Sequence, residues 1–121
     1  MKMNLDCMRE VLLTLEQQVP GNMSGAELKT SLAPSFSEDD VAYACTKLNE
    51  GGYIKANIKE LSSGNILVSV SDITFIGHEL LNVIRNNKIW EEAKTKAEEN
   101  ESASLSIVYH LAQTIALKNL S

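Results

Sequence analysis

Residues 36–73 read FSEDDVAYACTKLNEGGYIKANIKELSSGNILVSVSDI, and this stretch decides the fold. Its first part, 37–50, starts with a serine and repeats apolar residues every three or four positions, as one face of a helix does. Two glycines follow, which favour the left-handed stop of a helix. Two apolar, alternating segments, 53–60 and 66–73, then flank the loop 62–65. The pattern predicts a helix that leads into a β-hairpin.

Two further helices are predicted before this stretch. Apolar residues from Leu5 to Val19 recur on one helical face, and Pro20-Gly21 ends that face. Residues 21–23 are expected to form a short edge strand. Residues 24–27, Ser-Gly-Ala-Glu, form a capping box in which Glu27 returns to the Ser24 amide, and a short helix follows to about Leu32. Three helices that end in a hairpin are the outline of a winged helix, a helix-turn-helix with a β-hairpin wing.

Alternation along the hairpin predicts which side chains face the core. Ile54, Ala56 and Ile58 alternate with polar residues on the first strand. On the second strand, we expect Ile66, Val68 and Val70 to share one face. The glycine of the loop, Gly64, and Asn65 lie where a hairpin turn needs positive φ.

More helices are expected after the hairpin. Thr74 caps a fourth helix that Asn86-Asn87 interrupts, and two more run over about 88–99 and about 104–120. The predicted fold class is therefore α+β: a winged helix with a C-terminal helical extension. We expect one domain over 1–121, with its winged-helix core at about 4–73 and its C-terminal helices at about 74–121.

Composition excludes several classes of protein. The chain has 121 residues, 44% of them hydrophobic, and a formal net charge of −5. The charge argues against a general nucleic-acid coat or an anionic membrane surface. No run reaches the length of a membrane span, and the N-terminus lacks the apolar stretch of a signal peptide. We expect a cytoplasmic protein with Cys7 and Cys45 as free, core thiols.

The sequence predicts no catalytic residue, no metal site and no cofactor. His78-Glu79 starts a pattern like His-Glu-x-x-His, but position 82 is Asn, so the second zinc-binding histidine is missing. The cysteines and histidines match no zinc module in their spacing, and Cys45 lies on a predicted core face. A metal-dependent hydrolase that uses His78 and Glu79 is the weakest hypothesis. Non-enzymatic function is the prediction.

The first functional hypothesis is a DNA-binding transcriptional regulator. In a helix-turn-helix the second helix enters the major groove, and here that helix is 37–50. The candidate DNA contacts lie on that helix, on the wing and on the helix before: Lys29, Tyr43, Thr46, Lys47, Lys55 and Lys59. No arginine, the usual reader of guanine, stands on the reading helix or the wing.

The alternative is a protein-interaction module on the same scaffold. Glu38, Asp39 and Asp40 open the reading helix, where they complement the helix dipole but repel phosphates. These acidic residues are the candidate contacts to a protein partner.

The last predicted helix, 104–120, is apolar over most of its circumference. Such a helix is either buried in its own domain or faces a partner. We expect a homodimer through this helix as one of these two outcomes, with Leu105, Val108 and Ile115 as the candidate contacts.

Three stretches resemble a known family: residues 5–13, residues 37–54, and TFIGHELL at 74–81 followed by Ile84-Arg85 and Trp90. The chain resembles small uncharacterised winged-helix proteins of bacteria and phages, classed as a domain of unknown function, over about its first 90 positions. One departure is Ala44, where the family often has histidine. The resemblance implies the fold and a phage or mobile-element context. It assigns no role to Gly77, His78 or Glu79, for which structural roles are favoured.

Overall fold

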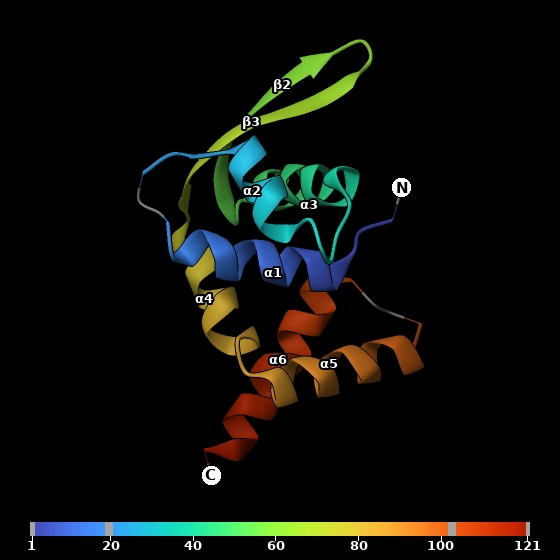
Figure 1. Ribbon diagram of the computed structural model, residues 1–121. Coiled ribbons are helices and arrows are strands. Elements are labelled where there is room, and N and C mark those ends of the chain that lie inside the picture. The colour runs from blue at the N-terminus through green and yellow to red at the C-terminus, as the bar shows by residue number, and fades with distance from the viewer. Residues whose placement is uncertain (1, 19–20, 102–103, 121) are drawn as a thin grey trace. The chain divides into compact units, whose positions relative to one another are not determined.

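The computed structural model describes residues 2–18, 21–101 and 104–120 (Figure 1). These residues form two compact units, Met1–His78 and Glu79–Ser121, each of which is considered by itself. The single domain expected from the sequence stays a prediction.

Three capped helices lie in the first unit: α1 (Leu5–Glu16), α2 (Gly25–Leu32) and α3 (Glu38–Glu50). A polar side chain precedes each helix and accepts a hydrogen bond from the backbone N–H three residues later, which satisfies one of the orphan donors of the first turn. These caps are Asn4 to Cys7 at 3.0 Å, Ser24 to Glu27 at 3.0 Å, and Ser37 to Asp40 at 3.1 Å.

Two details of these helices differ from the expectation. α1 ends at Glu16, so its apolar face is shorter than predicted, and Val19 and Pro20 lie outside the described residues. In the capping box of α2, the hydroxyl of Ser24 donates to the Glu27 carboxylate at 3.2 Å, where the sequence suggested the Ser24 amide as donor.

The end of α3 has the geometry of a Schellman motif. The N–H of Tyr53 donates to the carbonyl of Leu48 at 2.9 Å, and the N–H of Gly52 donates to that of Asn49 at 3.1 Å. Gly52 has φ 81°, the left-handed conformation that glycine adopts without steric cost. The predicted glycine stop is confirmed, and it turns the chain directly from α3 into the sheet.

The sheet has three antiparallel strands in the order β1-β3-β2. Their bounds are β1 (Met23–Ser24), β2 (Ile54–Leu61) and β3 (Gly64–Ile73). β2 and β3 form the wing, a hairpin that projects beyond the three helices (Figure 1). The turn is shorter than predicted, because Leu61 already pairs with Gly64 and only residues 62–63 remain between the strands.

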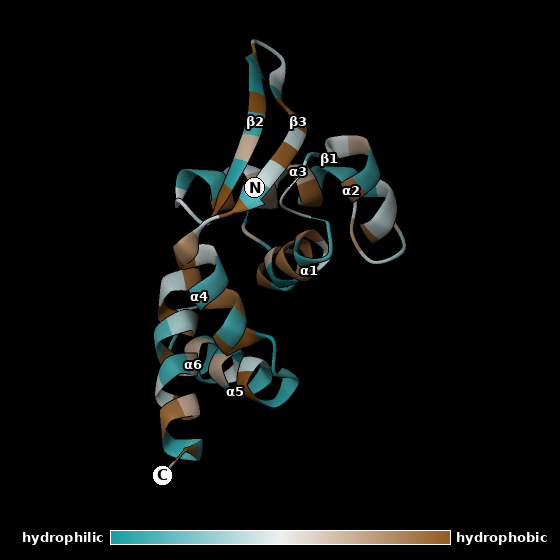
Figure 2. Cartoon of the chain, turned by 90° about the vertical axis from the view of Figure 1, so that its left-hand side faces the viewer, coloured by the Kyte–Doolittle hydropathy of each residue, from teal (hydrophilic) through white to brown (hydrophobic). Residues whose placement is uncertain are grey.

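The prediction that Ile66, Val68 and Val70 share one face is wrong. The residues of β3 that are buried are Leu67, Val70 and Ile73, whereas Ile66 and Val68 are exposed. Pairing with β2 skips one residue of β3 between Ile73 and Val70 and another between Val70 and Leu67. Each extra residue is a β-bulge, which shifts the alternation by one position. The inward residues are therefore three apart instead of two, and Figure 2 shows hydrophobic and hydrophilic residues mixed along both strands.

The core of the first unit lies where α1, α2 and α3 pack on one another and on the sheet. It is aliphatic, as the low aromatic content requires. Its fully buried members include Val11, Leu12, Leu15, Leu28, Val41, Cys45, Leu48 and Val70.

Gly77 belongs to α4 (Phe75–Ile84) and lets the start of that helix lie close to Tyr53 and to the end of β3. A Cβ at Gly77 would overlap the carbonyl oxygen of Tyr53 and the side chain of Ile73. Thr74 holds the same junction: its hydroxyl donates to the carbonyl of Gly52 at 2.5 Å and accepts from the N–H of Gly77 at 3.1 Å. The predicted Thr74 cap and the structural role of Gly77 are both confirmed.

The second unit contains the later turns of α4 together with α5 (Asn87–Glu99) and α6 (Leu105–Asn119), which pack against each other. Asn86 caps α5 and Ser104 caps α6. Trp90 is fully buried, and the ammonium of Lys94 lies 5.6 Å from the centre of its ring. In the described part of the chain, no helix is long and apolar enough to cross a membrane.

Candidate nucleic-acid interface

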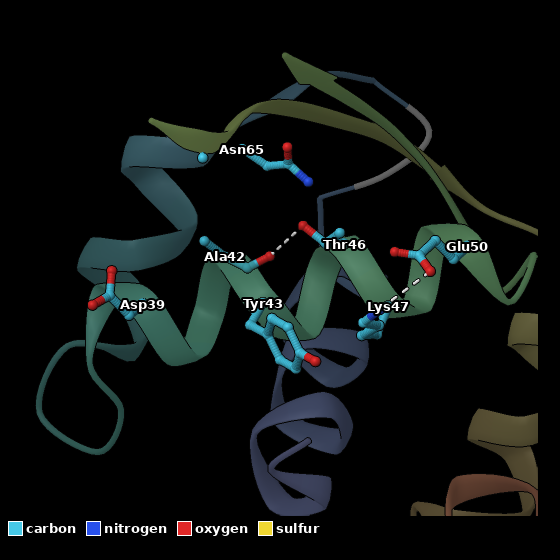
Figure 3. A pocket seen from close by; sticks show the side chains of 8 residues that line it. Asp39, Ala42, Tyr43, Thr46, Lys47, Glu50 and Asn65 are labelled. Carbon is cyan, nitrogen blue, oxygen red and sulfur yellow. Dashed lines mark hydrogen bonds and ion pairs between the residues drawn. The ribbon is translucent and has the colours of Figure 1, made fainter. Parts of the chain in front are cut away.

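An open hollow of about 370 Å³ lies between the outer face of α3 and the turn of the wing (Figure 3). α3 contributes most of the lining, and the first two residues of β3 close the hollow from the wing. The lining residues are Asp39, Ala42, Tyr43, Thr46, Lys47, Glu50, Gly64 and Asn65. Three of the predicted DNA contacts, Tyr43, Thr46 and Lys47, are therefore brought together on one surface.

Lys47 is held on this surface by two neighbours. Its ammonium lies 3.2 Å from a carboxylate oxygen of Glu50 and 5.4 Å from the centre of the Tyr43 ring. Both side chains of the ion pair reach solvent, so the pair is worth about 0–1 kcal/mol. A phosphate can therefore compete with Glu50 for Lys47 at small cost.

The hydroxyl of Thr46 has a local partner. It donates to the backbone carbonyl of Ala42 at 2.9 Å, one helical turn earlier (Figure 3). The hydroxyl proton is thereby engaged, and the oxygen remains able to accept a hydrogen bond from a base or a water.

The wing lysines lie on the other side of the wing from the hollow. Asn65 lines the hollow and pairs with Glu60, and directly paired residues point to the same face of a sheet. Successive residues of a strand point to opposite faces, and both bulges have their extra residue on β3, so β2 alternates without interruption. Lys59 and Lys55 therefore point to the outer face of the wing, away from α3, and both are exposed.

Lys29, the remaining predicted contact, stands apart from the hollow. It is half-buried on α2, and its charge lies close enough to Cys45 to affect that thiol. Burial raises the pKa of Cys45 to about 12, the neighbouring Cys7 adds to the rise, and Lys29 opposes it. Burial, with smaller contributions from Asp40 and Glu10, also raises the pKa of Cys7 to about 12.

The acidic residues keep their predicted place at the start of α3. Glu38 and Asp39 are exposed and Asp40 is half-buried, and Ser37 caps the same turn. Asp39 also lines the hollow, so the surface is acidic at its leading end and at Glu50, with Lys47 between. Over Met1–His78 the sequence has ten acidic residues against six lysines and arginines. Any nucleic acid bound here meets a local cation in an acidic surrounding.

Sequence reasoning missed the part of the site that the wing supplies. Gly64 and Asn65 are loop residues in the sequence-based prediction, yet they begin β3 and close the hollow. No local signal marks them, because their position depends on how far the hairpin pairs.

The residues considered for metal chemistry form no site in the described part of the chain. His78 and Glu79 are exposed on α4. Among the described residues, no three His, Cys, Asp or Glu side chains group closely enough to hold a metal ion. The free cysteines are buried and carry raised pKa values, which disfavours the reactive thiolate form.

Comparison with known proteins places the chain in a family and confirms the fold. The family model described as "Hypothetical protein (DUF2513)" matches residues 2–104. An "Uncharacterized protein" of Haemophilus influenzae is 32% identical over 127 aligned positions, which cover 100% of both chains. This relative is bacterial, and the phage or mobile-element context stays a prediction.

A solved structure shares the architecture. The crystal structure of a PadR-like transcriptional regulator from Bacillus cereus matches with a TM-score of 0.51 and 20% identity, over 80% of this chain and 92% of that one. At this identity the likeness concerns the fold alone. The fold is thus an α+β winged helix with C-terminal helices, as predicted.

Proposed function

This chain belongs to the DUF2513 family of hypothetical proteins and has the winged-helix fold, and on that premise we propose that it binds double-stranded DNA as a regulator of transcription. The observation that carries the proposal is the surface on which Tyr43, Thr46 and Lys47 of α3 meet Asn65 of the wing. A reading helix and a wing that share one open, polar surface can contact the major groove and the adjoining backbone of a duplex. The Bacillus cereus protein of similar fold is a PadR-like transcriptional regulator, which supports the same class of function.

The proposed contact uses the middle and C-terminal turns of α3. Lys47 meets a phosphate, and Thr46 and Asn65 face base edges or bound water, since hydroxyl and amide groups serve in such contacts. Lys55 and Lys59, on the outer face of the wing, meet the flanking backbone. Lys29 takes no part, because it is half-buried on α2 away from the hollow. The proposal includes a homodimer, since a two-fold pair of reading helices binds two half-sites on one duplex.

A titration of labelled duplexes tests the proposal. A pool of random duplexes, each about three helical turns long, is selected with the protein at low salt, and enriched sequences are measured by fluorescence anisotropy. We expect Lys47→Ala to weaken binding to all sequences and to lower the slope of log affinity against log salt by about one. Lys96→Ala, an exposed lysine on α5, is the matched control and leaves binding unchanged. Failure to bind any duplex at low salt refutes the proposal.

A second candidate function is favoured by the acidic start of α3. Glu38 and Asp39 are exposed and offer a basic protein partner a charged contact on an ordered helix end. The double variant Glu38→Gln/Asp39→Asn separates the two functions. If the chain binds DNA, the double variant removes the repulsion of phosphates and binds the duplex more tightly. If the chain binds a basic protein, the double variant binds less tightly to the partner that cross-linking recovers.

A further inference from the structure

α6 differs from α5 in the chemistry of its exposed side. The 13 residues of α5 include seven charged side chains, as is usual for a helix in contact with water. The 15 residues of α6 include Lys118 and no acidic residue. The exposed side of α6 therefore carries far fewer charged side chains than the exposed side of α5.

Three large apolar residues on and directly after α6 are exposed. Ile107 is 41%, Leu117 67% and Leu120 84% exposed. Together with His110 and Gln113 they follow steps of three or four residues, which places all five on one stripe of the helix. The dimer contacts predicted from the sequence, Leu105, Val108 and Ile115, are buried instead, so a dimer surface on α6 has to use this other stripe.

A small apolar hollow lies beside the C-terminal end of the stripe. It has a volume of about 220 Å³ and is lined by Val83, Gln113, Ala116, Leu117 and Leu120. All of these residues belong to the second unit. The stripe thus carries protruding apolar side chains at both ends and a recess at one of them.

The stripe is complementary to the same stripe of a second copy when the two helices are antiparallel. If a second α6 lies antiparallel, with a two-fold axis between Gln113 and Thr114, Ile107 stands opposite the partner's Leu120. The same register sets His110 opposite the partner's Leu117 and Gln113 opposite the partner's Thr114. Ile107 of each copy then reaches the other copy's hollow, and the amide of Gln113 can donate to the partner's Thr114 hydroxyl. An isologous two-fold interface requires this kind of self-complementary surface.

We infer that the exposed stripe of α6 and the adjoining hollow bind the same surface of a second copy, in an antiparallel helix pair. The inference rests on the homodimer of the proposed function and deepens it by naming its contact surface, and none of its residues belongs to α3. A second copy is the occupant because the same stripe carries both the protruding Ile107 and the hollow that the partner's Ile107 can fill. The stripe has no acidic residue, so two copies meet without opposed carboxylates.

The size of the surface limits the apolar area that the dimer can bury. One face of α6 is about 22 Å long and about 10 Å across. It is therefore smaller than the ~800 Å² per partner of a standard interface. The dimer is accordingly weak and depends on protein concentration, and paired DNA half-sites add to its stability through avidity.

Sedimentation velocity over protein concentrations from about 5 to about 500 µM, without DNA, tests the pairing whatever the outcome for DNA binding. The wild type shifts from monomer to dimer across this range, as a weak interface requires. Leu117→Asp, at an exposed position, abolishes the shift, whereas Ile66→Asp, at an exposed apolar position on the wing, preserves it. Far-ultraviolet circular dichroism of each variant establishes that it is folded.

Leu120→Asp provides a second test of the pairing if Leu117→Asp does not fold. A wild type that stays monomeric overturns the inference. So does a dimer that survives in a folded Leu117→Asp or Leu120→Asp variant.

Cysteine cross-linking tests the direction of the pair. In an antiparallel pair, the double variant Ile107→Cys/Leu120→Cys forms a disulfide-linked dimer under mild oxidation, and the single variant Leu117→Cys does not. The natural cysteines, Cys7 and Cys45, are buried and do not compete. In a parallel pair in register each position of the stripe faces the same position of the partner, so Leu117→Cys would cross-link by itself. That result would contradict the antiparallel geometry.

Discussion

At the scale of single residues, the ion pair with Glu50 competes with DNA phosphate for the ammonium of Lys47. Their 3.2 Å contact is exposed, and Glu50 lines the same hollow as Lys47. Glu50→Gln releases the ammonium and removes a negative charge beside the DNA. We expect tighter duplex binding by up to about fivefold, since an exposed pair is worth about 0–1 kcal/mol. Anisotropy titration measures it, with Glu92→Gln on α5 as control; weaker binding of Glu50→Gln would contradict the role of Lys47.

A second prediction at this scale concerns Gly77. Gly77→Ala places a methyl group against the carbonyl of Tyr53, where the backbone cannot give way easily. We expect it to lower the free energy of unfolding by about 1–3 kcal/mol, as overpacking does. Urea denaturation measures the change. Glu79→Ala, two residues later and exposed, is the matched control, and equal stability of the two variants would be evidence against the close approach.

The buried thiols give a third residue-level prediction, on pH. Burial raises the pKa of both Cys7 and Cys45 from 9.0 to about 12. Between these values the unfolded chain loses the thiol protons and the folded chain keeps them. The thiols therefore contribute to a loss of stability as pH rises above about 9. Urea denaturation under reducing conditions at about pH 8 and 10.5 should show a smaller decrease for Cys45→Ala than for the wild type; an identical decrease would show that the Cys45 thiol contributes nothing.

At the scale of elements, the wing depends on its two bulges. Leu67 is buried and Ile66 is exposed, the reverse of what alternation predicts. Leu67→Ala should cost about 2–5 kcal/mol of stability, in the range of buried leucine truncations. Ile66→Ala should change it by less than about 0.5 kcal/mol, as a surface substitution does. If urea denaturation shows the larger loss for Ile66→Ala, the register of the wing is wrong.

Short sequence patterns predict the helices and strands, but they do not predict features that depend on contacts between distant parts of the chain. The caps at Ser24 and Ser37 and the glycine stop after α3 depend on residues a few positions apart, so the sequence contains them. The face of β3 and the membership of Asn65 in the hollow depend on cross-strand pairing, which no short pattern encodes. For the same reason Lys55 and Lys59, grouped with Lys47 by sequence, lie on the other side of the wing.

The last helix shows the same limit. Its apolar periodicity indicates an unusually apolar surface, but periodicity does not say which of the apolar residues the chain itself covers. Leu105 and Val108 are buried, whereas Leu117 and Leu120 are exposed. The choice depends on contacts with residues far away in the sequence.

At the scale of the whole molecule, net charge opposes the proposed function and sets the conditions under which it appears. With −5 overall, long-range attraction to DNA is absent and binding depends on a few local contacts. The exposed acids Glu38 and Asp39 contribute to that repulsion at the leading end of α3. Their neutralisation should lower the stability of α3 by about 0.3–1 kcal/mol each through the helix dipole. It should nevertheless improve binding to a duplex.

The most direct test of the central claim, that the outer face of α3 binds DNA, is an anisotropy titration of a selected duplex at low salt with three proteins. We expect the wild type to bind, Lys47→Ala to bind more weakly, and Glu38→Gln/Asp39→Asn to bind more tightly. A wild type that binds no duplex, or three proteins that bind equally, would contradict the claim.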